Sequence, residues 1–196
     1  MRLLVGLGNP GEGYAKSRHN LGFVAIDRVA ETLADISWKK VEGGLLAEVW
    51  LSEKHLLFKP TLFMNRSGLP VRQLMDYYRI SSENLCIVAD DVYIAPGTVR
   101  IRPDGGAGGH NGWKSILEHI EGNDFWRVRI GAGVYPHNLE DRQELPPLDD
   151  YVLLNLPPED RKRATDSIDR LVPNLVEWLK SGASLKEETV HTLIET

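Results

Sequence analysis

Residues 2–11 of this 196-residue chain read Arg-Leu-Leu-Val-Gly-Leu-Gly-Asn-Pro-Gly, an apolar run that stops at a glycine-rich turn. The run from Arg2 to Leu7 predicts a short buried strand, and Gly8-Asn9-Pro10-Gly11 predicts the turn that ends it. From Asn20 to Ala34, apolar residues recur at helical spacing, with Asn20 as the expected N-cap. A buried strand followed by a turn and an amphipathic helix is typical of α/β domains.

The following residues continue this alternation of strands and helices. Apolar patterning predicts strands at 45–51, 54–59, 84–89, 98–102 and 126–132, and helices at 68–78 and 112–120. This order predicts one α/β domain over residues 1–196, in which a central mixed, mostly parallel twisted sheet is flanked by helices.

The last third of the chain has a different character. Residues 135–150 combine prolines and charges without a period, which predicts a long surface loop. From about residue 158 an apolar stripe predicts a C-terminal helical segment, which Pro173 should kink or divide. Residues 184–194 are expected to form a final short helix or a frayed tail.

Composition narrows the class of protein. Apolar residues make up 42% of the chain and charged residues 26%, as in ordinary globular proteins. The lone Cys86 excludes an internal disulfide and fits a reducing compartment. No apolar stretch reaches the ~18 residues of a membrane span, and the N-terminus does not resemble a signal peptide, so a cytoplasmic protein is expected.

The net charge of −5 argues against a sequence-independent nucleic-acid binder that relies on many phosphate contacts. It leaves room for a local basic patch, and arginines do alternate in Arg100-Ile101-Arg102 and Arg127-Val128-Arg129. Residues two apart in a strand share a face, so each segment would present paired positive charge. A solvated strand face explains the same spacing, and the pattern alone does not separate the two interpretations.

Two further turns pair asparagine with glycine: Met-Asn-Arg-Ser-Gly at 64–68 and Gly-Gly-His-Asn-Gly at 108–112. Neutral amides offer both donors and acceptors, which suits a polar, uncharged group such as a peptide. A phosphate cradle at 105–112 is the alternative, although this loop lacks the Lys-Ser/Thr ending of a P-loop. A dinucleotide site at the first turn is disfavoured because Pro10 and residues 12–14 separate the glycines from the helix.

His19 and Asp90 are candidates for proton transfer. His19 directly precedes the first predicted helix, and Asp90 ends a buried strand, where ligands bind in open α/β sheets. A carboxylate there can fix the tautomer of an imidazole, whose ordinary pKa of ~6.5 suits proton transfer. A lone histidine is more often structural. Asp91 beside Asp90 suggests a metal site, but no histidine lies at a spacing that would complete one. Neither a metal nor a cofactor is therefore expected.

No serine or cysteine lies in a nucleophile-elbow context such as Gly-x-Ser-x-Gly. If the protein is a hydrolase, water activated by His19 is therefore the expected nucleophile. This chemistry suits an ester, whose leaving group is better than an amine.

Taken together, these segments resemble the bacterial peptidyl-tRNA hydrolase family. The motifs run in family order from residue 5 to residue 131, with similar spacing. They comprise Val5–Gly11, Tyr14, Arg18–Asn20, Thr61, Phe63–Asn65, Ser67-Gly68, Asp90, Gly108–Gly112, Arg127 and Arg129–Gly131. The resemblance implies a monomeric enzyme that cleaves the ester between a peptide and the 3′ end of tRNA, with peptidyl-tRNA as its partner.

The resemblance also implies a role for each site residue. His19 is the general base that activates water, Asp90 supports it, and Asn9 helps to distinguish blocked from unblocked aminoacyl groups. Residues implied to bind the substrate or tRNA are Tyr14, Phe63, Met64, Asn65, Asn111, Arg102 and Arg129, of which the two arginines match positions that contact tRNA phosphate.

The chain departs from the family pattern beside the site. Ala89 stands where a histidine is usual, and Val92-Tyr93-Ile94 replaces a more usual Leu-Asp-Leu. The segment 134–150 is longer and richer in proline than the family pattern. One alternative is therefore a non-catalytic RNA-binding protein on the same scaffold, as in the related chloroplast splicing factors. A nucleotide-dependent enzyme that uses the glycine loops is a weaker one.

Overall fold

A computed structural model describes residues 1–122, 124–137, 144–183, 185–186 and 188–191. An eight-stranded sheet runs through it in the order β2-β3-β4-β1-β5-β7-β6-β8. The neighbours β4, β1, β5 and β7 are parallel, and the outer strands pair antiparallel. The strands are β1 (Leu3–Gly6), β2 (Trp38–Val41), β3 (Gly44–Trp50), β4 (Lys54–Pro60), β5 (Leu85–Asp91), β6 (Thr98–Arg102), β7 (Trp126–Gly131) and β8 (Glu188–His191).

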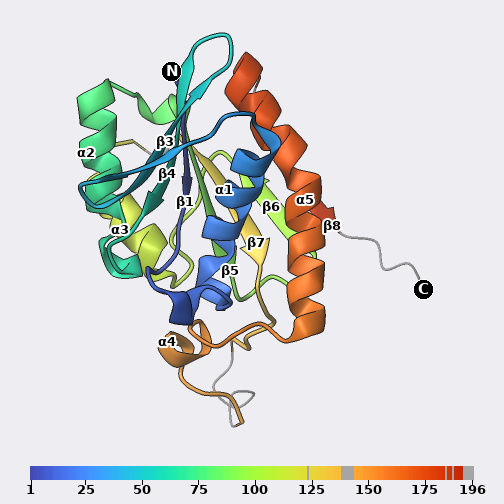
Figure 1. The fold of residues 1–196 in the computed structure, drawn as a ribbon. Coiled ribbons are helices and arrows are strands. Elements are labelled where there is room, and N and C mark those ends of the chain that lie inside the picture. The colour runs from blue at the N-terminus through green and yellow to red at the C-terminus, as the bar shows by residue number, and fades with distance from the viewer. Residues whose placement is uncertain (123, 138–143, 184, 187, 192–196) are drawn as a thin grey trace.

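Helices cover both faces of the sheet, which confirms the predicted α/β class (Figure 1). α1 and α5 share one apolar core with the sheet, and α2 and α3 share a second core on the opposite face. The short helix α4 lies at the end of the molecule where β1 and β5 finish. The helices are α1 (Leu21–Thr32), α2 (Gly68–Tyr78), α3 (Asn111–His119), α4 (Leu148–Tyr151) and α5 (Pro158–Ser181).

The first helix packs unusually close to the central strands. A Cβ at Gly22 would lie 2.4 Å from the carbonyl oxygens of Leu7 and Val88, so only glycine fits there. α1 therefore begins directly over the ends of β1 and β5. The 3₁₀ turn that precedes it, Arg18–Asn20, lies at the same end of these strands, in contact with β5. This contact brings His19 to the strand that carries Asp90.

Several local predictions need correction. β5 extends two residues beyond the predicted strand 84–89, through Asp90 and Asp91, which pair with β7. β2 was not predicted, because a four-residue edge strand with two exposed lysines has little apolar pattern. Pro173 does not divide α5, which continues through it as one helix, since buried side chains on both sides of the proline hold it on the sheet.

The tail and the long loop also differ from expectation. Of residues 184–194, Glu188–His191 form β8, an edge strand on β6, where a final helix or a frayed tail was expected. Residues 184, 187 and 192–194 lie outside the described residues. A free strand edge offers unpaired N–H and C=O groups, a tertiary feature that local propensity does not reveal. In the predicted surface loop Tyr135 is buried and α4 forms a short helix, whereas residues 138–143 lie outside the described residues.

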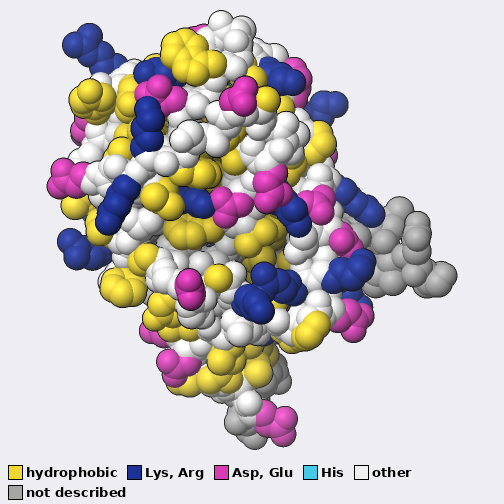
Figure 2. All heavy atoms as spheres, in the orientation of Figure 1, with side chains coloured by type: hydrophobic (Ala, Val, Ile, Leu, Met, Phe, Trp, Pro, Cys, Tyr) yellow, Lys and Arg dark blue, Asp and Glu magenta, His cyan; other side chains and the backbone are white. Residues whose placement is uncertain are grey.

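The visible face carries mixed charge. Figure 2 shows Lys and Arg side chains interspersed with acidic ones instead of gathered into one patch. Hydrophobic side chains gather at the lower end, over the region of α4, and the exposed ones near α4 include Leu153 and Leu154. Among the helices that the structure describes, none is long and apolar enough to cross a membrane.

Candidate active site

An open cavity of about 360 Å³ lies where the parallel strands end. Its walls come from the turn before α1, the end of β5, the glycine loop before α3, and α4. The lining residues are His19, Asp90, Asp91, Val92, Tyr93, Gly108, Gly109, His110, Asn111, Arg129, Leu148, Asp149 and Val152. The predicted His19, Asp90, Asn111 and Arg129 are thus brought to one cavity.

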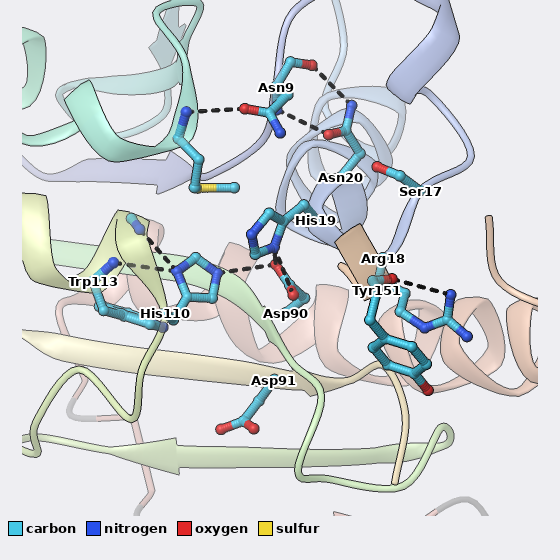
Figure 3. Close-up of polar contacts among 12 residues, drawn as sticks. Asn9, Ser17, Arg18, His19, Asn20, Asp90, Asp91, His110, Trp113 and Tyr151 are labelled. Atoms are coloured by element: carbon cyan, nitrogen blue, oxygen red, sulfur yellow. Dashed lines mark hydrogen bonds and ion pairs between the residues drawn. The ribbon is translucent and has the colours of Figure 1, made fainter. Parts of the chain in front are cut away.

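His19 and Asp90 form a buried pair (Figure 3). His19 Nδ1 lies 2.9 Å from Asp90 Oδ2 and 3.0 Å from Oδ1. His19 is 5% exposed and Asp90 1%. The backbone N–H of His19 donates to the carbonyl oxygen of Val152, so the segment after α4 fixes the turn that carries the imidazole.

The hydrogen bonds determine which His19 nitrogen carries the proton. Burial alone would raise the pKa of Asp90, but the adjacent His19 and His110 outweigh it and hold that pKa well below its usual range. An ionised carboxylate only accepts hydrogen bonds, so His19 Nδ1–H donates, and in the neutral imidazole Nε2 keeps its lone pair. Nε2 has no hydrogen-bond partner within the described part of the chain. The imidazole can therefore accept a proton from a molecule in the cavity.

His110 is a site residue that the sequence analysis did not single out. Its Nε2 lies 3.0 Å from Asp90 Oδ1, and its ring centroid is 4.7 Å from that of His19. Its Nδ1 accepts the backbone N–H groups of Gly112 and Trp113, which makes His110 the side-chain cap of α3. A histidine beside Asn111 in a loop before a helix was the available signal, but histidine is not a common N-cap.

The two contacts of His110 fix it as a neutral donor. Because Nδ1 accepts, Nε2–H donates to Asp90. Burial lowers the pKa of His110 more than the nearby Asp90 raises it. Asp90 therefore does contact a second imidazole, but this imidazole comes from the N-cap of α3 and not from position 89. Ala89, the residue directly before Asp90, packs in the core on the α2 and α3 side of the sheet.

Replacing His110 with asparagine should separate its two roles. An asparagine oxygen can still cap α3, but its shorter side chain should lose the bond to Asp90, lowering the free energy of unfolding at pH 7.5 by about 1–2 kcal/mol. The pKa of His110 is lowered in the folded protein. Neutral His110 therefore contributes to the free energy of unfolding above the unfolded pKa of ~6.5, and this contribution is lost as pH falls through the folded value.

H110N should lose this contribution, so its stability should fall less steeply than that of the wild type below pH ~6.5. Urea unfolding at pH 7.5, 6.5 and 5.5 measures both slopes. The buried His55, whose pKa burial also lowers, contributes equally to both proteins. Identical slopes would contradict the neutral, donating state assigned to His110.

Asn9 and Asn20 join the first glycine turn to the turn that carries His19. The backbone N–H of Asn9 donates to Asn20 Oδ1, and Asn20 Nδ2 donates to the carbonyl of Asn9. Asn20 thus stands at the N-cap position of α1 without capping it, because its side chain is used in this clasp.

The carboxamide of Asn9 has a fixed orientation. Its Oδ1 accepts the backbone N–H of Met64, which leaves Nδ2 as the free end of the amide. Among the described residues nothing accepts a hydrogen bond from Nδ2. Asn9 is bonded to Asn20, the residue that follows His19 (Figure 3), so this donor is fixed relative to the turn that carries His19.

The other predicted substrate residues do not line the cavity. Met64 is buried and contributes its backbone N–H to Asn9. Phe63 is 59% exposed, Asn65 is exposed and Tyr14 is half-buried. They lie on the turns before α1 and α2, so a substrate larger than the cavity would be needed to contact them.

The four arginines share one face of β6 and β7 but have different environments. Register pairs Arg100 with Arg129 and Arg102 with Arg127. Arg127 is 1% exposed, stacks on the Phe125 ring, and has its pKa lowered by burial to about 10. A wholly solvated strand face is therefore excluded.

The two predicted phosphate contacts are both engaged within the protein. Arg129 Nη1 donates to Asp91 Oδ2 at 3.1 Å on the cavity wall. Arg102 lies outside the cavity lining and donates to the carbonyl of Glu188 in β8. Of these two arginines, only Arg129 lines the cavity that holds His19 and Asp90.

His19, Asp90 and His110 are also of the ligand types that transition metals use. One donor atom from each lies within 4.8 Å of the others. These same atoms are hydrogen-bonded to one another, with Asp90 as the shared acceptor. A metal would have to displace the protons that hold the network, so the arrangement fits proton transfer better.

Comparison with known proteins gives one consistent family. Residues 3–195 match the family model described as peptidyl-tRNA hydrolase. The peptidyl-tRNA hydrolase of Oceanobacillus iheyensis is 40% identical, and the match covers 95% of this chain and 96% of that protein. The enzyme of Gloeobacter violaceus is 39% identical, with 93% and 89% covered.

Solved structures agree with this result. The crystal structure of peptidyl-tRNA hydrolase from Acinetobacter baumannii superposes with a TM-score of 0.82 at 34% identity, covering 93% of this chain and 89% of that one.

Proposed function

Because the chain belongs to the peptidyl-tRNA hydrolase family, it cleaves the ester bond between peptide and tRNA, and we propose that His19 is the general base of this reaction. The observation that carries the proposed role is the buried His19–Asp90 pair, whose unbonded Nε2 belongs to a cavity-lining side chain. Asp90 is the residue that orients this base.

Water is the nucleophile in this mechanism. His19 Nε2 accepts a proton from water as the oxygen attacks the ester carbonyl carbon. The new imidazolium is stabilised by ionised Asp90 through Nδ1–H, without proton transfer to the carboxylate. Collapse of the tetrahedral intermediate breaks the bond to the ribose oxygen, which takes the proton back and leaves free tRNA and peptide.

Asn9 binds the first peptide unit of the substrate. Its Nδ2 is a donor because Oδ1 is occupied by the backbone N–H of Met64. An N-blocked substrate presents a carbonyl oxygen that can accept this donor, whereas the ammonium of an unblocked aminoacyl group presents only donors. Asn65 and Asn111 bind further polar groups of the peptide, with Tyr14, Phe63 and Met64 around its end.

The test compares substrates that differ only in this block. Purified protein without added metal should release the N-acetylamino acid from N-acetylaminoacyl-tRNA, and should not release the amino acid from the same aminoacyl-tRNA unblocked. The variant N9A should narrow this difference, and unchanged discrimination would remove the role given to Asn9. Wild-type protein that binds the blocked substrate without releasing product would favour the RNA-binding alternative.

Arg102 and Arg129 are the proposed contacts to tRNA phosphate. They lie on adjacent strands and on one face, which supports a short basic track leading from the cavity. Phosphate contacts release counterions, so KM in the same assay should rise as salt is added. A KM that does not change with salt would count against these contacts.

We assign the enzyme to the cytoplasm as a monomer. The buried, reduced Cys86 is consistent with a reducing compartment, and burial raises the pKa of its thiol. A solution mass well above 22.0 kDa by light scattering would contradict the monomer.

A further inference from the structure

Part of the cavity lining is apolar. His19, Asp90 and Asn111 provide polar groups to this cavity, whereas Val92, Tyr93, Leu148 and Val152 provide apolar surface, with the charged Asp149 beside Leu148. These four apolar residues form the apolar wall. Proton transfer needs no such surface.

Tyr93 is held in place from several directions. Its backbone N–H donates to Asp91 Oδ1 at 2.9 Å. Its ring stacks on His137, with centroids 4.3 Å apart and planes 10° from parallel, and meets the edge of Tyr135 at 6.2 Å. The Tyr135 hydroxyl in turn donates to the carbonyl of Pro146. These contacts hold the ring in one orientation, so little side-chain conformational entropy remains to be lost when substrate binds.

The opposite part of the apolar wall is tied to the catalytic turn. The carbonyl of Val152 accepts the backbone N–H of His19. The guanidinium of Arg18 lies 4.0 Å from the ring centroid of Tyr151 and donates to the carbonyl of Leu154. The position of α4, and with it Leu148 and Val152, is thus fixed relative to His19.

We propose that the apolar wall is a subsite for the side chain of the amino acid esterified to tRNA, and that it favours large apolar side chains. The inference rests on the function proposed above, which places the ester carbonyl beside His19. The side chain branches from the Cα atom, which is bonded directly to that carbonyl carbon, so it lies against a wall adjacent to His19. Val152 and Tyr93 belong to this wall in the same cavity.

The terminal adenine is the other flat group in this substrate. It is joined through the ribose, several bonds from the ester carbon, and its edge carries polar atoms that need partners. The apolar wall offers three aliphatic side chains and one ring. This lining fits a hydrocarbon side chain better than a base.

The experiment uses one tRNA body charged with N-acetylalanine, N-acetylleucine or N-acetylphenylalanine, so that only the side chain varies. For the wild-type enzyme, kcat/KM for the phenylalanyl and leucyl esters should exceed that for the alanyl ester by at least about tenfold. Y93A should reduce the Phe/Ala ratio to within about twofold of one, and Y93F should retain it. L148A, on the other part of the wall, should also reduce the ratio.

The readout is a ratio within one preparation, so a partly unfolded variant does not distort it. A wild-type ratio near one, or a ratio unchanged by Y93A, would overturn the subsite. Y93A lowering all three substrates by the same factor would also overturn it, because the ring would then contact an invariant part such as the terminal base. Absence of release from any blocked substrate would instead refute the hydrolase function itself.

Discussion

Replacing His19 with alanine is expected to lower kcat by about 10²–10⁴-fold while leaving the affinity for tRNA nearly unchanged. The variant removes the atom proposed to accept the proton from water, His19 Nε2. It leaves unchanged the hydrogen bonds between the Asn9 backbone and the Asn20 side chain, and the arginines of β6 and β7. Loss of general-base catalysis should therefore appear in kcat and not in binding.

Single-turnover release from N-acetylaminoacyl-tRNA measures the rate, and filter binding of uncharged tRNA measures affinity. A matched control is H119A, since His119 lies in α3 outside the cavity lining and donates to the carbonyl of Ser115 one turn earlier. H119A should keep most of the rate. An H19A variant within tenfold of the wild-type rate would show that His19 is not the base.

Replacing Asp90 with asparagine should lower kcat by about 10²–10⁴-fold. Asp90 accepts hydrogen bonds from both His19 Nδ1–H and His110 Nε2–H. An amide offers one oxygen and two N–H donors, so it cannot accept from both imidazoles in the same way. His19 would then place its proton on Nε2, the nitrogen that must be unprotonated to act as base.

Asp91 provides the control for this change, because the same substitution is made one residue along β5. Asp91 pairs with Arg129 and not with either histidine. D91N should therefore alter KM more than kcat. Equal losses of kcat in D90N and D91N would indicate a general effect of charge at the end of β5 and would contradict the specific support of His19.

Patterning along the sequence was sufficient for much of the fold. Apolar runs of four to seven residues and 3.6-residue periods gave β1, β3 to β7 and α1 to α3, because burial of these elements depends on their own side chains. β2 and β8 were not predicted, since edge strands owe their form to a neighbour and carry little pattern. The course of α5 through Pro173 likewise depended on packing against the sheet.

The sequence also supplied the chemistry of the candidate site. Asn9, His19 and Asp90 were identified by residue type and by their place at element ends, and the family resemblance implied a role for each of them. Tyr93 appeared only as a departure from the family pattern. Its significance depended on the stack with His137, which no local pattern indicates.

By itself the sequence determined the α/β class and the family, since both follow from the identity and spacing of residues along the chain, and it supplied His19 and Asp90 as candidates for proton transfer. Only the tertiary structure decided that Asp90 serves two imidazoles and that α4 closes an apolar wall against His19. The contacts behind these features join residues 20 to 133 positions apart. Their geometry is set by the packing of helices on the sheet, and local sequence carries no direct record of it.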